Sequence, residues 1–495
     1  MNIGGRHPSV WVFAILWASY GYVWQGRDWN SASRLMLTYA IVDRGTVRID
    51  GLEDQTRDLA RYQDHWYTDK TPGFSIAAIP PYWLAKTFGH LPDHPLDQKG
   101  FAHWPADAWI TWGTSGLFTA LTGAILASLA LKLGCGPRQA GLLGLAYGLA
   151  TPASVYATLA YGHQLAAFGL FAAFALIVDP GPRVRVQATL AGFLAAYASV
   201  VEIQVGPVSA ILGLTVLGLV LARRLPVGAL VGFTLGASVP TLILLGYNKI
   251  AFDSPWKMGY FFLVMDRFKD VHSTDNPLGL IRPDLAKVRE LLWGERRGLL
   301  WFAPILILAP IGWTMLLAQR RWLIAGLIGS ISLAIFLVNL SYPEWTGGWT
   351  TGPRLLVPML PFACLAVAPV LATNRRIVLI PALLLGIFGG VEMLLFEGVG
   401  GRVPDAIARP LVEGVWPIWR GDRLPGWVFG QRFAHNLASL TLPELERKLP
   451  PGFGFLTFAP LVGFQILAIL AMCRVLPKSG PNSPGRPIPP GHAEE

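Results

Sequence analysis

The chain has 495 residues, of which 53% are hydrophobic and 14% charged, and its formal net charge is +10. Long apolar runs almost free of charge are typical of a multi-pass helical membrane protein and exclude a string of soluble domains. The basic residues lie in short clusters between these runs and form no single patch, so topology explains the charge and no nucleic-acid partner is expected. Three cysteines, far apart and in or beside apolar runs, fit neither a disulfide framework nor a zinc site.

Twelve apolar runs are long enough to cross a bilayer as α-helices, which rise about 1.5 Å per residue. They lie near residues 9–25, 108–131, 139–159, 162–178, 186–203, 205–222, 226–247, 299–318, 322–341, 355–373, 377–396 and 456–473. The sequence therefore predicts an all-α integral membrane protein of about twelve transmembrane helices, in one domain over residues 1–476. The tail of residues 477–495, rich in Pro, Gly and Ser, is predicted to be disordered and cytoplasmic.

Basic residues in alternate connections predict the orientation of the bundle. They are Lys132 with Arg138, Arg183 with Arg185, Arg223 with Arg224, Arg320 with Arg321, Arg375 with Arg376, and Arg474 with Lys478. Because positive residues gather on the cytoplasmic side, we expect these connections and both termini in the cytoplasm. Three long segments, 26–107, 248–298 and 397–455, are then external loops.

The apolar run from Gly73 to Gly89 is a thirteenth candidate, but the charge count keeps the whole segment 26–107 on one side of the membrane. Pro80 and Pro81 would also break a transmembrane helix near its middle. We therefore expect an interfacial or re-entrant helix within the first external loop.

A second helix is expected earlier in the same loop. Leu35, Leu37, Ala40 and Ile41 recur at roughly helical spacing, and either Ser31 or Ser33 would cap the amino end of such a helix.

Polar residues stand at the outer ends of several predicted spans: His163, Glu202, Asn248 and Arg354. A polar group in lipid costs a few kcal/mol or more, so such residues are functional candidates. The alternative is that each merely contacts water among the lipid headgroups. Because all four lie on one face, we expect them to line an outward-facing polar cavity.

Two external loops carry arginines and tryptophans. In the loop 341–356, Trp349 and Arg354 accompany several glycines, a pattern that suits a phosphate or a sugar face but equally a structural turn with interfacial tryptophans. Arg296 and Arg297 precede a span on the external side, against the usual charge bias. An anionic lipid headgroup or a salt bridge to Glu295 would explain them.

The first external loop supplies the candidate acids, of which one general base near an acceptor hydroxyl would be enough. His65 and Asp69 would share one face of a helix and help to hold a metal ion, but two ligands are too few and Pro72 opposes a helix there. No cofactor is expected from the sequence, and a divalent metal ion stays open as an alternative. Walker A, G-x-S-x-G and CxxC motifs are absent.

Several stretches together resemble the GT-C glycosyltransferases, which use polyprenyl-phosphate sugars as donors and include protein O-mannosyltransferases and the lipid A aminoarabinose transferase. The stretch "YTDKTPG", residues 67–73, resembles the acid-Lys-Pro-Pro step of that superfamily. Residues 30–50, 161–167, 247–260, 294–299 and 347–354 resemble stretches of a little-characterised bacterial branch.

The resemblance implies that Lys70 contacts the lipid-linked phosphate, with Tyr67 and His65 beside it in the substrate site. In the better-known members a catalytic aspartate lies just after the first span, a few residues before an arginine. Here Asn30 and two serines precede Arg34, so the sequence departs from the pattern. The candidates for the catalytic aspartate are therefore Asp28, Asp58 and Asp69.

The function implied by the resemblance is transfer of a hexosyl or pentosyl group, with inversion at the anomeric carbon, from a polyprenyl-phosphate donor to an envelope lipid, glycan or protein. The reaction is expected on the external face of a bacterial inner membrane. A transporter or flippase of lipid-linked sugars is the alternative, but neither a pair of discontinuous helices in matching halves nor acids at the bilayer midplane are visible in the sequence. A non-catalytic scaffold protein is a third class, and it would need no external cations for phosphate.

Overall fold

The computed structural model describes residues 7–89, 105–269, 271–420, 435–438 and 454–477. The predicted disordered tail lies almost wholly outside these ranges, as do parts of the first and last external loops. The helices of the bundle are α1 (Pro8–Tyr20), α5 (Pro105–Thr111), α6 (Leu117–Lys132), α7 (Pro137–Leu149), α8 (Ala153–Ala157), α9 (His163–Val178), α10 (Val184–Val201), α11 (Gly206–Leu221), α12 (Val227–Phe252), α14 (Leu299–Phe302), α15 (Ala309–Ala318), α16 (Trp322–Ser341), α17 (Leu360–Ala372), α18 (Arg376–Val399) and α22 (Ala459–Val475).

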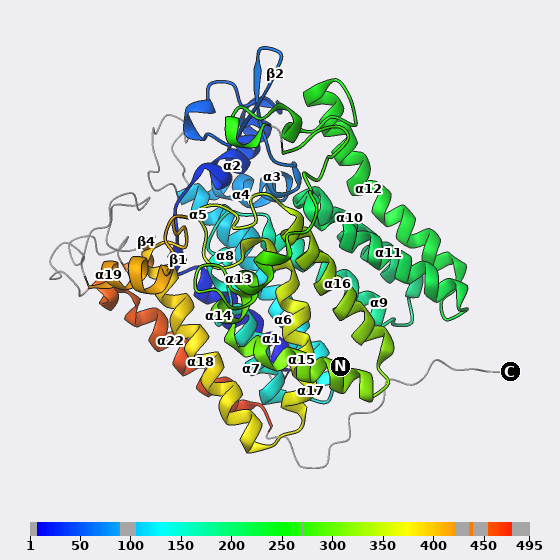
Figure 1. Ribbon diagram of the computed structural model, residues 1–495, viewed down its shortest axis with the longest axis vertical. Helices are drawn as coiled ribbons and strands as arrows, with labels where there is room; N and C mark the ends of the chain where they lie inside the picture. Colours follow the sequence, from blue (N-terminus) through cyan, green and yellow to red (C-terminus); the bar gives the residue numbers. More distant parts are fainter. Residues whose placement is uncertain (1–6, 90–104, 270, 421–434, 439–453, 478–495) are drawn as a thin grey trace.

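The connecting segments carry shorter elements (Figure 1). Their helices are α2 (Trp29–Arg44), α3 (Gly73–Ala77), α4 (Ile79–Phe88), α13 (Val288–Trp293) and α19 (Trp416–Trp419). Strands β1 (Val23–Trp24) and β4 (His435–Asn436) form one antiparallel pair, and β2 (Leu59–Tyr62) and β3 (His65–Thr68) form another. Single-turn 3-10 and π segments, such as Ile203–Val205, Gly259–Phe262 and Arg354–Met359, join several of these elements.

Eight helical segments of the described chain are long and apolar enough to cross a membrane. Three shorter apolar helices, Pro8–Tyr20, His163–Val178 and Pro304–Ala318, accompany them. The protein is therefore a multi-pass membrane protein. All twelve predicted runs are helical over most of their length, although the run 139–159 is interrupted between α7 and α8. That each run crosses the bilayer stays a prediction.

Connections that carry the basic clusters contact one another at one end of the bundle. Arg321 donates to the carbonyl of Lys132 at 3.2 Å, Lys132 forms an ion pair with Asp179, and Gln139 donates to Asn374 at 2.8 Å. The first loop, the α8–α9 turn and the end of α10 meet at the other end, where Asp28, Arg34, Tyr161 and Glu202 lie. The alternation read from the charges is thus present in the fold.

The first predicted loop helix exists as α2, but the prediction of its cap is wrong. Asp28 is the N-cap residue, and its carboxylate accepts the backbone N–H of Ser31 at 2.8 Å. The Ser31 hydroxyl in turn accepts the backbone N–H of Asp28, which completes a capping box. An aspartate at this position also places a negative charge at the positive end of the helix dipole.

The run from Gly73 to Gly89 forms two short helices, α3 and α4, which meet at Ala78. Pro80 and Pro81 lie in the first turn of α4, where a missing backbone N–H removes no helical hydrogen bond. The Tyr197 hydroxyl of α10 donates to the Gly73 carbonyl at 2.7 Å. The segment is thus too broken to be one long span, while its position at the membrane surface stays a prediction.

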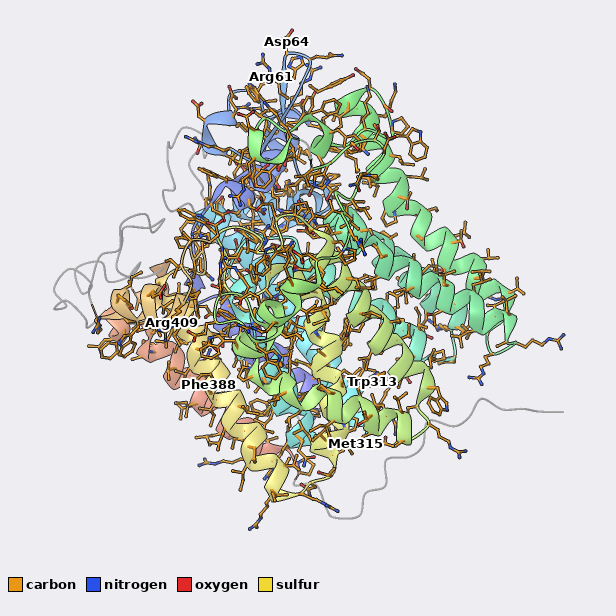
Figure 2. The ribbon with its side chains drawn as sticks, in the orientation of Figure 1. Arg61, Asp64, Trp313, Met315, Phe388 and Arg409 are labelled. Atoms are coloured by element: carbon orange, nitrogen blue, oxygen red, sulfur yellow. The ribbon has the colours of Figure 1, made fainter. Side chains whose placement is uncertain are left out.

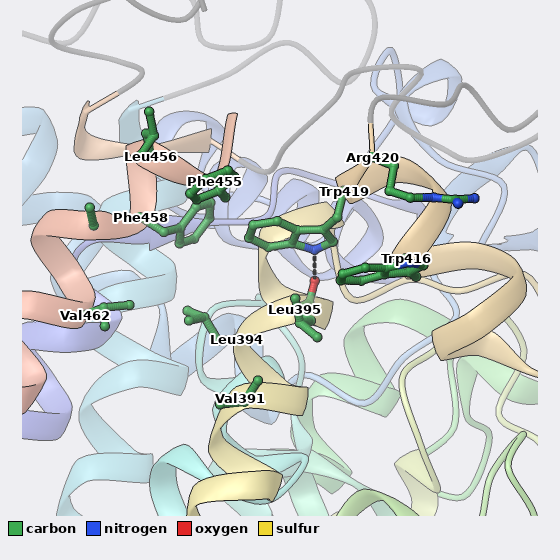
Figure 3. A pocket seen from close by; sticks show the side chains of 11 residues that line it. Val391, Leu394, Leu395, Trp416, Trp419, Arg420, Phe455, Leu456, Phe458 and Val462 are labelled. Carbon is green, nitrogen blue, oxygen red and sulfur yellow. Dashed lines mark hydrogen bonds between the residues drawn. The ribbon is translucent and has the colours of Figure 1, made fainter. Parts of the chain in front are cut away.

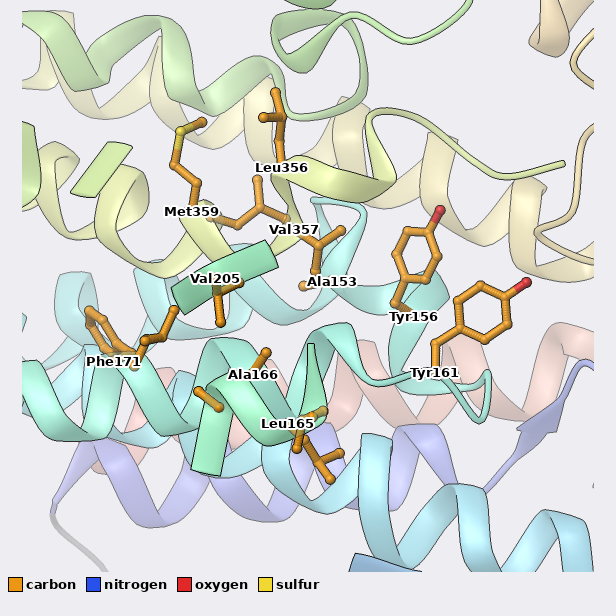
Figure 4. Packing of buried hydrophobic residues seen from close by; sticks show 14 of the residues in the cluster. Ala153, Tyr156, Tyr161, Leu165, Ala166, Phe171, Val205, Leu356, Val357 and Met359 are labelled. Atoms are coloured by element: carbon orange, nitrogen blue, oxygen red, sulfur yellow. The ribbon is translucent and has the colours of Figure 1, made fainter. Parts of the chain in front are cut away.

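The core places two tyrosines beside the loop end of the bundle. Figure 4 shows Leu165, Ala166 and Phe171 of α9 among apolar side chains from 356–359, with the hydroxyls of Tyr156 and Tyr161 pointing away from this packing. At the far edge of the first loop, Figure 2 shows Arg61 and Asp64 at the tip of the β2–β3 hairpin. The hairpin tip is exposed, whereas its base lies against the bundle.

Candidate functional site

A lysine held between two aspartates lies at the base of the β2–β3 hairpin. Lys70 Nζ is 2.6 Å from Asp69 Oδ2 and 2.9 Å from Asp58 Oδ2. The strand register explains the arrangement: Leu59 pairs with Thr68, so the residues just before β2 and just after β3 are neighbours. The fold therefore brings together three of the predicted site residues, two of which are 12 positions apart in the chain.

Burial and charge act in opposite directions on this cluster. Burial raises the pKa of Asp69, and Asp58 adds to the increase, while Lys70 opposes it. Burial alone would lower the pKa of Lys70, but the two carboxylates outweigh it and raise that pKa above the usual value for lysine. Lys70 is accordingly a cation at neutral pH. The Ser33 hydroxyl of α2 donates to Asp69 Oδ1 at 3.2 Å and fixes that side chain to the helix.

A second ion pair connects α2 to the junction of α10 and α11. Arg34 Nη2 lies 2.6 Å from Glu202 Oε1, and His163 Nδ1 lies 3.7 Å from the same oxygen. The Arg34 side chain is 2% exposed and that of Glu202 is 10% exposed. Two of the polar residues predicted at span ends, His163 and Glu202, are therefore in one buried cluster with the first loop.

Asp28 is held by donors on two sides. Beyond its contacts with Ser31, it accepts a hydrogen bond from the Tyr161 hydroxyl, and Arg402 Nη1 lies 4.0 Å from its Oδ2. The guanidinium carbon of Arg354 lies 5.5 Å from the centroid of the Tyr161 ring, within cation–π range. Arg354 Nε is buried and has no hydrogen-bond acceptor among the described residues. A buried donor without an acceptor is costly, and an anionic ligand would satisfy it.

The remaining predicted site residues have other contacts. The Asn248 amide donates to the Pro255 carbonyl at 3.0 Å, Tyr67 packs on Phe252 with ring centroids 5.2 Å apart, and His65 Nδ1 lies 2.8 Å from Asp50 Oδ2. Trp349 is 42% exposed. These contacts stabilise the loops around the cluster, and ligand binding by the four residues stays a prediction.

The two arginines predicted to lie on the external side also contact loop backbone. Arg297 is fully buried and donates to the carbonyls of Thr346 at 3.1 Å and Gly348 at 2.9 Å. Arg296 donates to the carbonyl of Asp405. Glu295 pairs with Arg409 at 3.0 Å and with neither of these arginines in the described contacts. Arg297 therefore fixes the loop that carries Trp349 and Arg354.

The helical geometry considered for a metal pair is wrong, because residues 65–68 form strand β3. Within the described ranges, no group of three or more His, Cys, Asp or Glu side chains is placed to hold a metal ion. The position between Asp58 and Asp69 is taken by the Lys70 ammonium.

The sequence analysis missed three further residues. Tyr161 and Arg402 contact Asp28, and Arg402 could have been found by the rule that selected Arg354, since it follows a pair of glycines at the outer end of a span. The third is Glu392, within the apolar helix α18. Its carboxylate oxygens are buried without a hydrogen-bond partner in the described part of the chain.

An apolar cavity of about 540 Å³ lies between α18, α19 and the start of α22 (Figure 3). Trp416, Trp419, Phe455 and Leu456 line it, and Arg420 is the one charged residue among its lining side chains. None of the charged cluster around Lys70 belongs to this lining. The cavity suits an apolar ligand, and no Asp, Glu or His is among its described lining residues.

No protein-family model and no curated protein sequence matches the chain. Among solved structures, it is similar to ArnT from Cupriavidus metallidurans bound to undecaprenyl phosphate, with 16% identity, a TM-score of 0.48, and 94% of this chain and 76% of that chain covered. It is also similar to the archaeal oligosaccharyltransferase AglB from Archaeoglobus fulgidus in complex with an inhibitory peptide and a dolichol-phosphate, with 12% identity, a TM-score of 0.46, and 90% and 60% covered. Both are GT-C proteins, the superfamily that the sequence motifs resemble. The roles of individual residues rest on this chain's own contacts.

Proposed function

We propose that the protein is an inverting membrane glycosyltransferase that transfers a sugar from a polyprenyl-phosphate donor to a hydroxyl of an envelope lipid, glycan or protein. The observation that carries the proposal is the charged cluster at one end of the bundle. It combines a lysine between two carboxylates with an arginine whose buried Nε lacks an acceptor among the described residues. Such a site offers cations that can neutralise a phosphate and a carboxylate that can accept a proton.

The chemistry follows from these groups. A lipid phosphate is a fair leaving group once its negative charge is neutralised, and Lys70 and Arg354 supply charge-assisted hydrogen bonds for this purpose. A carboxylate removes the proton from the acceptor hydroxyl. Attack on the anomeric carbon from the side opposite the phosphate inverts its configuration. The donor is a membrane lipid, so the reaction needs no soluble nucleotide-binding domain.

The cluster belongs to the external face in this proposal, with both termini in the cytoplasm of a bacterium and the bundle in its inner membrane. The distribution of basic residues supports this orientation. In this proposal the loops 248–298 and 397–455 select the acceptor, and their residues Gly259 and Arg402 lie beside Asp69 and Asp28, respectively. Membrane lipids surround the apolar helices.

The proposal is tested with the full-length Lys70→Ala variant. Removing the ammonium should abolish the envelope product that the wild-type gene restores in a deletion strain, and should weaken binding of undecaprenyl phosphate to the purified protein. Lys86→Ala is the matched control, because Lys86 is an exposed lysine of the same loop that pairs with Asp43. Full product with Lys70→Ala, in a protein that is inserted and folded, would refute the phosphate role.

Transport of a lipid-linked sugar is the second candidate, and the buried Glu392 in α18 favours it, because acids within spans are typical of transporters. Proteoliposomes with a labelled polyprenyl-phosphate sugar distinguish the two. A transporter moves the intact lipid across the bilayer in a manner lost in Glu392→Gln, whereas a transferase leaves it in place until an acceptor is added.

A further inference from the structure

The contacts around Lys70 distinguish the three candidate acids. Asp28 already accepts hydrogen bonds from the Ser31 backbone, the Ser31 hydroxyl and the Tyr161 hydroxyl, and it caps α2. Both oxygens of this carboxylate are therefore occupied by donors of the protein itself. Its contacts fit a residue that holds the helix, and they leave Asp58 and Asp69 as bases.

Asp58 and Asp69 both pair with Lys70 but differ in their other contacts and in the exposure of their side chains. Asp69 also accepts from the Ser33 hydroxyl at 3.2 Å, and its side chain is 6% exposed. Asp58 has Lys70 as the sole side-chain partner of its carboxylate among the described contacts, and its side chain is 17% exposed. Asp58 is therefore the acid that an incoming acceptor reaches more readily, and the one held by a single bond.

Lys70 has one more donor than the two carboxylates use. An ammonium carries three N–H groups; Asp69 accepts one of them and Asp58 lies 2.9 Å from Nζ as an ion-pair partner, which leaves at least one N–H for a ligand. One positive charge between two carboxylates leaves the trio with a net charge of about −1 when all three are ionised. An anionic phosphate that takes the third N–H competes with both carboxylates for the same charge, and Asp58, held only by this bond, loses most from the competition.

We propose that Asp58 is the catalytic base and that Lys70 couples it to the donor, an inference that rests on the proposed function. In the unliganded protein the ammonium holds Asp58 in an ion pair. When the donor phosphate attracts that ammonium, the Asp58 carboxylate is released from the ion pair and can accept the proton of the acceptor hydroxyl. Asp69 keeps Lys70 in position and acts through it.

In the transfer step one bond to the anomeric carbon forms while another breaks. The proton of the acceptor hydroxyl passes to Asp58, the acceptor oxygen forms the new bond to the anomeric carbon, and the bond from that carbon to the phosphate oxygen breaks. The departing polyprenyl phosphate takes the bonding electron pair. Asp58 then releases the proton to solvent or to the product phosphate.

The test compares binding with turnover in the full-length protein, with undecaprenyl phosphate as the probe and the envelope product in a deletion strain as the readout. Asp58→Asn removes the base and a competitor for Lys70. The product should therefore fall by about 100-fold or more, while undecaprenyl phosphate binds at least as tightly as to the wild type. Asp64→Asn, at the exposed hairpin tip, should change neither measurement.

Two outcomes overturn the inference. One is a product level for Asp58→Asn within a few-fold of the wild type. The other is a parallel loss of binding and product, which indicates a structural role. Asp58→Glu separates folding from chemistry, because it keeps a carboxylate and should give more product than Asp58→Asn. If the wild type itself fails to bind undecaprenyl phosphate and Lys70→Ala keeps the product, the proposed function fails; if only the Asp58 results disagree, the base assignment alone fails.

Discussion

Arg34 of α2 and Glu202 at the end of α10 form a buried ion pair with 2.6 Å between Nη2 and Oε1. The pair links the first loop to the bundle across 168 positions of the chain. Removing one member of a buried pair leaves the other charge without compensation. This contact should therefore contribute strongly to the position of the whole loop.

The Arg34→Met variant should be destabilised by about 3–5 kcal/mol, because Glu202 stays buried after it loses its hydrogen-bonded ion-pair partner. The measurement is the midpoint of thermal unfolding in detergent. Adding Glu202→Gln should recover part of the loss, since it removes the isolated charge. Arg61→Met is the control: its pair with Asp64 is exposed and 4.0 Å long, so the midpoint should hardly move. An unchanged midpoint for Arg34→Met would contradict the assignment.

The Tyr161→Phe variant separates the hydroxyl from the ring. It removes the hydrogen bond to Asp28, at a cost of about 1.5–3 kcal/mol for a bond to a charged group, but it keeps the ring beneath Arg354. Tyr156→Phe is the comparison, because Tyr156 donates to the neutral carbonyl of Thr351 at 3.0 Å. Thermal unfolding should show the larger shift for Tyr161→Phe. Equal shifts of the unfolding midpoint would show that the hydrogen bond to Asp28 contributes no more to stability than the bond from Tyr156 to a neutral carbonyl.

Gly73→Ala should disturb the site through packing alone. A Cβ at Gly73 would lie 2.6 Å from backbone atoms of Val200 and Val201, so α3 must move away from α10. We expect a lower unfolding midpoint and weaker binding of undecaprenyl phosphate, since Lys70 is three residues away. Gly246→Ala, where a Cβ meets no atom within 4 Å, is the control and should be tolerated. A Gly73→Ala protein with wild-type binding would show that α3 is free to shift.

The Arg297→Lys variant keeps the charge but loses the planar fork that reaches the carbonyls of Thr346 and Gly348. Amide hydrogen exchange in residues 346–354 should become faster, because the loop loses its fixed contacts. Arg409→Lys, at an exposed arginine, should leave that exchange unchanged. Unchanged exchange in Arg297→Lys would assign the order of the loop to other contacts.

Local patterns in the sequence predicted the local features of the molecule. Hydropathy found the helices, and the adjacency of Asp69 and Lys70 placed an acid beside the cation. The position of Asp58 depends on the β2–β3 register, and the four-residue strands on either side of Gln63 and Asp64 were too short to be recognised as a hairpin. The helix begins at Trp29 with Asp28 as its N-cap, so Ser31 lies in the first turn and its own N–H is the group that the Asp28 carboxylate accepts.

Long-range contacts could not be predicted from the sequence, for a different reason. The pairing of Arg34 with Glu202 and of Tyr161 with Asp28 joins residues more than 130 positions apart, and no local pattern encodes such a partner. Glu392 was overlooked because a single acid hardly changes the mean hydropathy of a 24-residue helix.

The base of the first loop is bonded to the end of α10: the Thr71 hydroxyl donates to the Val201 carbonyl at 3.1 Å, and Tyr197 donates to the Gly73 carbonyl. These two hydrogen bonds therefore fix the position of Lys70 relative to α10. Segment 248–298 is also bonded to β2, since the Val264 N–H donates to the Leu59 carbonyl at 3.1 Å. Under the proposed function, chimeras that exchange the rest of segments 248–298 and 397–455 between related proteins and keep this bond should change the acceptor and leave the lipid carrier the same.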